Sequence, residues 1–202
     1  VARLQDLVER QPDLLEARME LGYALLSVGR HDEVIALSDL TLAQIRAAPP
    51  GEPAFGDMQY EVWILDNRAS ALIRLERWDE AIAELERAAL MEEQGQSLNL
   101  AKLLCDLGRT REAAAALALP ARATSHGVRR AASIRHCIAV QEGDRAAARK
   151  AFSDIRRYRK ESTASWIDAL LRSGRTEDAA RALRKALTHE GRRNAMLSSL
   201  QI

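Results

Sequence analysis

Several residue types are scarce in this sequence of 202 residues. Aromatic residues make up 4% of it, and it contains two cysteines, five prolines and ten glycines. Two cysteines are too few for a scaffold built on disulfides, and no apolar run approaches the length needed to cross a bilayer. The net charge of +1 argues against a generic polyanion binder. The remaining composition, 47% hydrophobic and 29% charged residues, predicts a packed, mainly helical protein.

The motifs that carry most enzyme chemistry are also absent. The sequence contains no glycine-rich phosphate loop, no paired-histidine zinc motif, no Cys-x-x-Cys pair and no Gly-x-Ser-x-Gly nucleophile turn. Its histidines stand in different segments without the spacing of metal ligands: His31, His126, His136 and His189. We therefore expect no catalytic residues, no metal and no cofactor, and interpret the histidines as structural or surface residues.

The strongest positive signal is internal repetition. In five segments, an apolar helix end is followed by Gly-Arg or a variant, one or two acidic residues, and a second apolar helix. The turn residues, which are 47, 32, 35 and 31 residues apart, are Gly29, Glu76, Gly108, Gly143 and Gly174. The long first step contains an insertion at 46–57, which holds three of the five prolines and is predicted to be a loop. We interpret this insertion loop as a tolerated insertion, with a functional rim loop as the alternative.

Each repeat is predicted to be a helical hairpin. Glycine tolerates the left-handed conformation that ends a helix, and the acidic residues that follow it suit the positive end of the next helix. Thr110 and Thr176 are expected to cap the second helices of their units. Alanines such as Ala81 and Ala113 would let two helices approach closely. Stacked hairpins would bury the apolar stripe that a single hairpin leaves exposed.

These features resemble the tetratricopeptide repeat. The first full unit carries Leu21-Gly22 in its first helix and Gly29 at its turn, and Pro12 lies 17 residues before that turn. The second unit has the small and aromatic residues of the family at Ala69, Trp78, Ala81 and Ala88. The sequence departs from the family pattern at His136 and Ile167, which replace the small residue of the first helix.

The resemblance implies an all-α, right-handed solenoid that forms one repeat domain over 1–202. We expect about five helix-turn-helix repeats behind a leading helix at 1–12. The repeats are expected at about 13–48, 58–93, 96–120, 126–158 and 161–190, and a C-terminal cap at 191–202.

In this family, the first helices line a concave groove that binds partner segments. The groove positions that the resemblance gives in this sequence are Tyr23, Trp63, Asp66, Arg74, Lys102, Arg130, Asp168 and Arg172. Aromatic and arginine residues are the usual anchors of an interface; the alternative for Tyr23 and Trp63 is packing against the insertion loop. Some family members hold a C-terminal carboxylate with lysines and asparagines. Met19, Tyr23 and Ser70 occupy those positions here, so we expect no such chaperone-tail binding.

Charge is divided unevenly along the chain. Residues 1–95 hold nine basic and nineteen acidic residues, a balance of −10, whereas residues 96–202 hold 21 basic and ten acidic residues, a balance of +11. Such a split of net charge favours head-to-tail self-association or alignment of a partner. The alternative is that the surface charge differs between the two halves without serving a function. The basic run at 156–160 includes one aromatic residue, Tyr158, where nucleic acid binding needs several stacking aromatics. Nucleic acid is therefore not an expected partner.

Cysteine usage and the chain start bear on the cellular compartment. Cys105 and Cys137 are interpreted as buried free thiols, with a disulfide between adjacent first helices as the alternative. The sequence begins at Val1 without a signal-peptide pattern, which indicates a mature product or a piece of a longer protein. We expect the cytoplasm, and the periplasm if a signal peptide precedes this sequence.

Together, these patterns predict a scaffold that binds a protein or peptide partner in its groove and catalyses no reaction. The first alternative is a regulatory or targeting domain of a larger enzyme or of a secretion or assembly protein. The second alternative is a scaffold that assembles with itself through its charge split.

Overall fold

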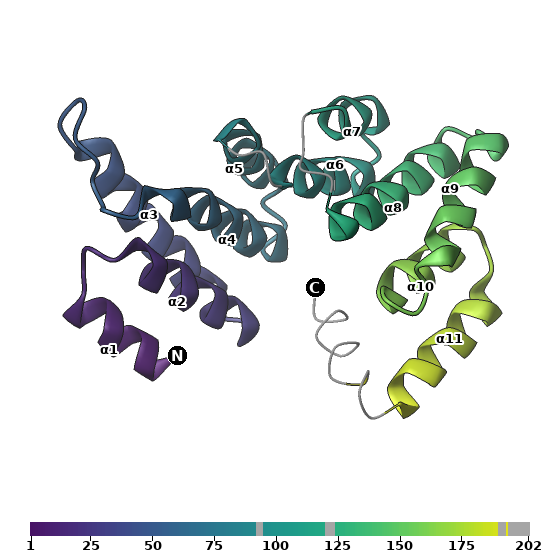
Figure 1. Cartoon of the computed structure of the whole chain (residues 1–202), viewed down its shortest axis with the longest axis horizontal. Helices are drawn as coiled ribbons and strands as arrows, with labels where there is room; N and C mark the ends of the chain where they lie inside the picture. The colour runs from purple at the N-terminus through teal and green to yellow at the C-terminus, as the bar shows by residue number, and fades with distance from the viewer. Residues whose placement is uncertain (92–94, 120–123, 190–192, 194–202) are drawn as a thin grey trace. The chain divides into compact units, whose positions relative to one another are not determined.

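The chain is helical through most of the residues that the computed structural model describes, which are 1–91, 95–119, 124–189 and 193. Those residues form eleven α-helices and one short 3-10 helix, and no strand (Figure 1). The prediction of an all-α protein is therefore confirmed. The helices fall into two compact units, Val1–Gln96 (unit 1) and Ser97–Ile202 (unit 2).

Unit 1 is built from helices that pack on their neighbours in sequence. They are α1 (Ala2–Arg10), α2 (Leu15–Ser27), α3 (His31–Ala47), η1 (Met58–Tyr60), α4 (Glu61–Arg74) and α5 (Trp78–Met91). Each α-helix contacts the next one, and α2 also lies beside α4 although α3 separates them in sequence. The first helices of consecutive hairpins are thus neighbours. Helix α1 falls within the expected leading helix at 1–12.

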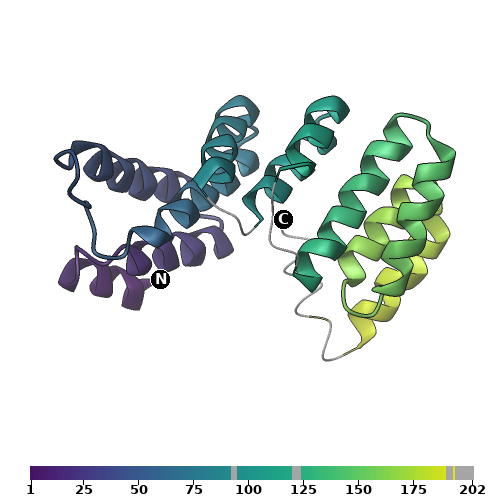
Figure 2. The ribbon, with the colours of Figure 1, turned by 45° about the horizontal axis from the view of Figure 1, so that its top comes forward.

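Unit 2 contains further helical hairpins, which Figure 2 shows as antiparallel pairs. Its helices are α6 (Gln96–Asp106), α7 (Thr110–Leu117), α8 (Ser125–Gln141), α9 (Arg145–Arg157), α10 (Thr163–Arg172) and α11 (Thr176–Thr188). Helix α8 packs on α9 and α10 packs on α11, and α10 also contacts α8 and α9. The expected C-terminal cap at 191–202 lies outside the described residues except for Arg193.

The five predicted turn residues all adopt the left-handed backbone conformation. Their φ values lie between 57° and 78°, at Gly29, Glu76, Gly108, Gly143 and Gly174. After each of them, the next backbone amide donates to the carbonyl five residues earlier, as Arg30 does to Leu25 at 3.0 Å. This bond is the 6→1 hydrogen bond of the Schellman motif, which ends a helix. One turn geometry therefore recurs five times, as the sequence pattern predicts.

The caps expected at Thr110 and Thr176 are wrong. The N-cap residues are Arg109 and Arg175, and neither helix has a side-chain cap. The Schellman bond uses the amide of the arginine and the helix begins directly after it, so each threonine lies inside the first turn. The arginine side chains pair instead with the acid three residues later, in Arg30–Glu33, Arg77–Glu80, Arg109–Glu112 and Arg175–Asp178.

A glycine allows the close approach of α2 and α4. A Cβ atom on Gly22 would lie 2.8 Å from Nδ2 of Asn67, which is closer than non-bonded atoms normally come. The same Nδ2 atom donates a hydrogen bond to the carbonyl of Met19 at 2.9 Å. Glycine at this position thus lets α4 donate a hydrogen bond to the backbone of α2.

The insertion loop is anchored to the core of unit 1. The expected bound at residue 46 is wrong by two residues, because Arg46 and Ala47 form the end of α3 and the loop begins at Ala48. The carboxylate of Asp57 in this loop accepts hydrogen bonds from the amides of Leu15 (3.0 Å) and Glu16 (2.8 Å). This carboxylate satisfies free amides at the start of α2 from 42 residues away. Phe55 is buried in the same core cluster as Leu15. The loop therefore has a structural role in unit 1.

The substitution Glu76→Gly is expected to stabilise unit 1 by about 1 kcal/mol. Glu76 is the one non-glycine residue with positive φ in the described part of the chain, and that conformation costs an L-residue about 1–2 kcal/mol. The greater freedom of glycine in the unfolded chain offsets part of this gain. Urea unfolding measures the difference. The matched control is Glu86→Gly in the exposed interior of α5, which should destabilise by about 1 kcal/mol; destabilisation by both changes would contradict the prediction.

Candidate functional site

Helices α2 and α4 of unit 1 carry four of the predicted groove residues. Tyr23 on α2 is 66% exposed and Trp63 on α4 is 39% exposed. Asp66 is half-buried on α4, and Arg74 is exposed at the end of that helix. We call the surface formed by these four residues the α2–α4 face. It combines two exposed aromatic rings with charges of both signs.

The α2–α4 face is held by contacts between its two helices. Besides the bond from Asn67 to Met19, the hydroxyl of Tyr60 donates to the Glu16 carboxylate at 2.9 Å. This hydrogen bond, with burial and nearby carboxylates adding to it, raises the pKa of Tyr60. Because Asn67 of α4 and Tyr60 of η1, which directly precedes α4, both bond to α2, the exposed aromatic residues stand on helices of fixed register. A partner would meet a surface that is already formed.

In unit 2, three other predicted residues meet in one ion-pair network. Arg172 on α10 pairs with Asp106 on α6 at 2.7 Å and with Asp168 on its own helix at 2.8 Å. Lys102 on α6 also pairs with Asp106. Burial acts to lower the pKa of Arg172, but its bonds to the two carboxylates outweigh burial and raise it. We call Lys102, Asp106, Asp168 and Arg172 the charged network; its members are engaged mainly with one another.

The charged network adjoins a disulfide, and the interpretation of both cysteines as free thiols is wrong. Cys105 on α6 and Cys137 on α8 are bonded to each other, with their Cα atoms 6.4 Å apart and both residues at most 1% exposed. They are 32 residues apart in sequence and lie on the first helices of consecutive hairpins, Cys105 three residues before Gly108 and Cys137 six residues before Gly143. The Gln141 amide donates to the Cys105 carbonyl at 2.8 Å, and the Arg172 guanidinium lies 3.1 Å from the Cys137 sulfur.

The last predicted groove residue, Arg130, lies half-buried near the start of α8. The structure thus divides the predicted set by unit. It places Tyr23 and Trp63 on neighbouring helices of unit 1 and joins Lys102 to Arg172 through Asp106 in unit 2.

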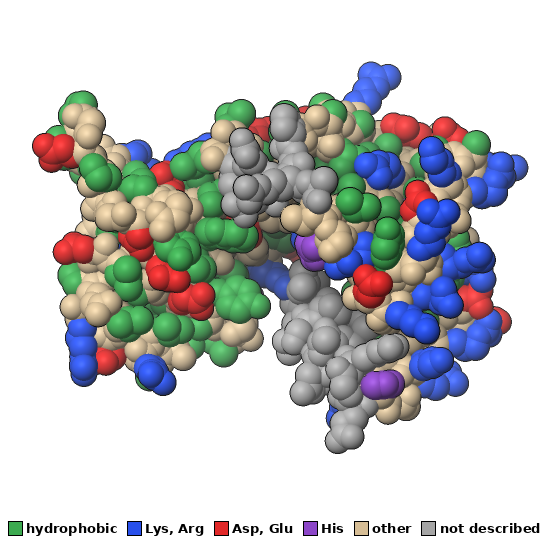
Figure 3. All heavy atoms as spheres, viewed as in Figure 1, with side chains coloured by type: hydrophobic (Ala, Val, Ile, Leu, Met, Phe, Trp, Pro, Cys, Tyr) green, Lys and Arg blue, Asp and Glu red, His purple; other side chains and the backbone are tan. Residues whose placement is uncertain are grey.

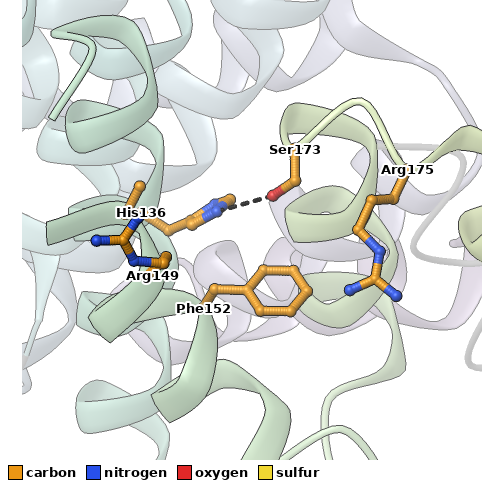
Figure 4. Close-up of a pocket in the computed structure, with 6 residues that line it drawn as sticks. His136, Arg149, Phe152, Ser173 and Arg175 are labelled. Atoms are coloured by element: carbon orange, nitrogen blue, oxygen red, sulfur yellow. Dashed lines mark hydrogen bonds between the residues drawn. The ribbon is translucent and has the colours of Figure 1, made fainter. Parts of the chain in front are cut away.

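A small pocket lies between α8, α9 and the turn that joins α10 to α11 (Figure 4). Its volume is about 220 Å³, and it is lined by His136, Ala148, Arg149, Phe152, Ser173 and Arg175. None of these residues belongs to the predicted groove. The sequence analysis did not predict this pocket; the only related signal is the recurring Gly-Arg turn, since Ser173 and Arg175 flank Gly174.

Ser173 makes two polar contacts beside His136. Its hydroxyl donates to the carbonyl of Ala169 at 2.7 Å and lies 3.1 Å from Nε2 of His136. The opposite ring nitrogen, Nδ1, is buried and has no hydrogen-bond partner in the described part of the chain. The imidazole is 1% exposed.

The environment of His136 favours its neutral form. Burial lowers the pKa of the imidazole, Asp168 opposes this effect, and Arg172 adds to it. Because the folded chain takes up this proton less readily than the unfolded chain, His136 costs stability as the pH falls below its ordinary pKa of 6.5. Well above that pH, His136 is neutral in both the folded and the unfolded chain and causes no loss of stability.

The surface of unit 2 is strongly basic around α9 and α11, and the face drawn in Figure 3 shows many of these side chains. The exposed basic residues of these two helices are Arg145, Arg149, Lys150, Arg156, Arg157, Arg181, Arg184 and Lys185. The sign of the charge changes close to the boundary between the units, because residues 1–95 carry −10 and residues 96–202 carry +11. Each compact unit therefore carries charge of one predominant sign.

A comparison of the chain with protein-family models, with curated proteins and with solved structures finds no match. Among the described residues, no group of three or more His, Cys, Asp or Glu side chains could hold a metal ion. In the same residues, no helix is both long and apolar enough to cross a membrane. The structure establishes an all-α protein of paired helices, and the tetratricopeptide resemblance stays a prediction.

Proposed function

We propose that this chain is a protein-interaction module that binds a segment of a protein partner on the α2–α4 face. The observation that supports this proposal is the exposure of Tyr23 and Trp63 on two adjacent helices of fixed register. Large aromatic side chains supply much of the binding energy at protein interfaces, and exposing them without a partner carries a cost in solubility. The proposed role is binding, and we assign no reaction to the chain.

The α2–α4 face favours a partner segment of mixed character. The two aromatic rings suit apolar side chains, Arg74 suits an acidic residue, and Asp66 suits a basic one. An amphipathic segment, either extended or helical, provides this combination. The charged network of unit 2 is a weaker candidate for partner binding, because its side chains already satisfy one another.

The substitutions Tyr23→Ala and Trp63→Ala are each expected to weaken partner binding at least tenfold. Each change removes from the proposed site an aromatic side chain that is 66% (Tyr23) or 39% (Trp63) exposed. The partner is first identified by affinity capture from source-cell lysate, and its binding segment is then titrated against the purified chain by calorimetry. The matched controls are Leu40→Ala and Leu90→Ala, which remove leucines that are 59% and 84% exposed on α3 and α5.

The controls decide whether the α2–α4 face is the binding site. Unchanged affinity in both leucine variants, together with loss in both aromatic variants, supports the proposal. Equal affinity in all four variants would place the partner elsewhere on the chain. Circular dichroism verifies that each variant is folded before binding is measured.

A second candidate function is head-to-tail self-assembly, which is favoured by the match between the charge boundary and the unit boundary. If the acidic unit of one copy binds the basic unit of the next, light scattering should show a mass that rises with protein concentration in about 0.05 M salt. The mass should return to that of a monomer in about 0.5 M salt, because the Debye length falls from about 14 Å to about 4 Å. A constant monomer mass at low salt would exclude this candidate.

The disulfide bears on the compartment in which the protein works. Buried disulfides persist in oxidising compartments and are rare in the cytoplasm, which was the compartment expected from the sequence. We therefore propose an oxidising compartment, such as the periplasm.

A further inference from the structure

The pocket of unit 2 has a cationic wall and an apolar wall. Arg149 is exposed on α9 and forms no ion pair within the described ranges of the chain. Arg175 pairs with Asp178 at 2.6 Å and also lies over the Phe152 ring, 5.5 Å from its centroid. Figure 4 shows Phe152 between the two arginines, below the imidazole of His136. Positive charge beside an aromatic face is the chemistry that recognises an anion attached to an apolar group.

His136 supplies an observation that is independent of the arginines. Its side chain is 1% exposed, and its Nδ1 atom has no hydrogen-bond partner among the described residues. Buried polar atoms in native proteins are nearly always satisfied, so an unmatched one often marks a functional position. The imidazole lines the pocket, where its protonated form would add positive charge next to a bound anion.

We propose that this pocket binds a small carboxylic acid, with its carboxylate on Arg149 and its apolar body against Phe152 and Ala148. The volume of about 220 Å³ is below the 300–1,000 Å³ typical of sites for drug-sized ligands, so the ligand is a small molecule. Carboxylate on guanidinium is a charge-assisted contact, and the basic surface around α9 and α11 raises the local concentration of anions. This binding site is separate from the α2–α4 face and does not depend on the proposed partner function.

Binding in this pocket is coupled to the proton on His136. Two charged side chains of α10, Asp168 and Arg172, act on the pKa of the imidazole, and Arg149 of α9 and Arg175 before α11 line the same pocket. Arg172 favours the neutral imidazole and Asp168 favours the charged one. A bound carboxylate adds a second negative charge, so it favours protonation of His136. By reciprocity, the affinity for the acid rises as the pH falls.

The test uses benzoate as the probe and NMR spectroscopy of the full chain. The His136 imidazole signal is assigned through its proximity to Phe152, whose ring centroid lies 5.7 Å away. We expect saturable shifts of this signal with a dissociation constant on the order of 1 mM at pH 6, as suits a ligand of about nine non-hydrogen atoms. Benzamide, which has the same shape without the charge, should bind at least tenfold more weakly. Affinity for benzoate should be at least threefold higher at pH 5.5 than at pH 7.5.

A matched pair of variants separates the pocket from the general positive field of unit 2. Arg149→Ala should weaken benzoate binding about tenfold, as expected for loss of one hydrogen bond to a charged group. Lys150→Ala removes a neighbouring exposed charge that does not line the pocket, and should change the affinity less than twofold. Three results would overturn the proposal: equal binding of benzamide and benzoate, equal losses in the two variants, or phosphate binding as tight as that of benzoate. Neither substitution touches the core, so both variants should remain folded.

Discussion

Reducing the disulfide between Cys105 and Cys137 is expected to lower the free energy of unfolding of unit 2 by about 3–4 kcal/mol. The bond joins residues 32 positions apart, and closing a loop of that length removes this amount of conformational entropy from the unfolded chain. The loss is large beside the 5–15 kcal/mol that stabilises a typical domain. Because both cysteines are buried, a reductant reaches the bond only after local opening. Reduction should therefore be slow under native conditions and faster in urea.

Urea unfolding with and without reductant measures the contribution of the disulfide. In a Trp63→Phe, Trp78→Phe background, Trp166 on α10 is the one tryptophan left and reports on unit 2. A Cys105→Ala, Cys137→Ala variant is the control, and reductant should leave its unfolding curve unchanged. Finding two reactive thiols in the unfolded, unreduced chain would refute the disulfide itself.

The turns could be predicted from the sequence because their geometry is local. The left-handed residue, the amide that follows it and the carbonyl that accepts its hydrogen bond all lie within six consecutive residues. This explains why Glu76 was identified as a turn residue although it is not a glycine. Its neighbours Leu72 and Arg77 form the same bond as Leu25 and Arg30 do. Local patterns also predicted the helix pairs around these turns.

Contacts between distant residues could not be predicted in the same way. Asp57 satisfies the amides of α2 across 42 residues, and no periodicity in the sequence connects the loop to that helix. The threonine caps failed for a related reason: the Schellman bond fixes where the next helix begins and takes precedence over the capping preference of a side chain. The disulfide lies between these cases. The expected position of both cysteines on adjacent first helices made the bond an alternative, but only the distance between α6 and α8 could decide it.

In the candidate site, too, the sequence predicted the positions of residues but not the contacts between them. Repeat register placed Lys102 and Arg172 on first helices, but it could not reveal that both pair with Asp106. Register gives the face on which a side chain lies, whereas ion pairing depends on distances between side chains of different helices. His136 was interpreted as structural for want of ligand spacing in the sequence. Its unmatched nitrogen became visible only once the surrounding helices were in place.

The substitution Arg172→Met is expected to destabilise unit 2 by about 2–3 kcal/mol. It removes the shared partner of Asp106 and Asp168 and the guanidinium beside the Cys137 sulfur. Breaking a fully buried ion pair costs about 3–5 kcal/mol. The expected loss is smaller here, because the two carboxylates are each 37% exposed and Asp106 keeps its pair with Lys102. Urea unfolding followed by Trp166 fluorescence measures this loss.

Two further variants separate a structural role of Arg172 from a role in partner binding. Arg172→Lys keeps the charge but loses the fork that reaches two carboxylates, so we expect an intermediate loss of about 1 kcal/mol. Arg184→Met, on the exposed surface of α11, should change stability by less than about 0.5 kcal/mol. If the charged network is structural, Arg172→Met lowers stability and leaves partner affinity within twofold. A tenfold loss of partner affinity with unchanged stability would show that Arg172 binds the partner. Removing a side chain that the fold needs would lower the free energy of unfolding.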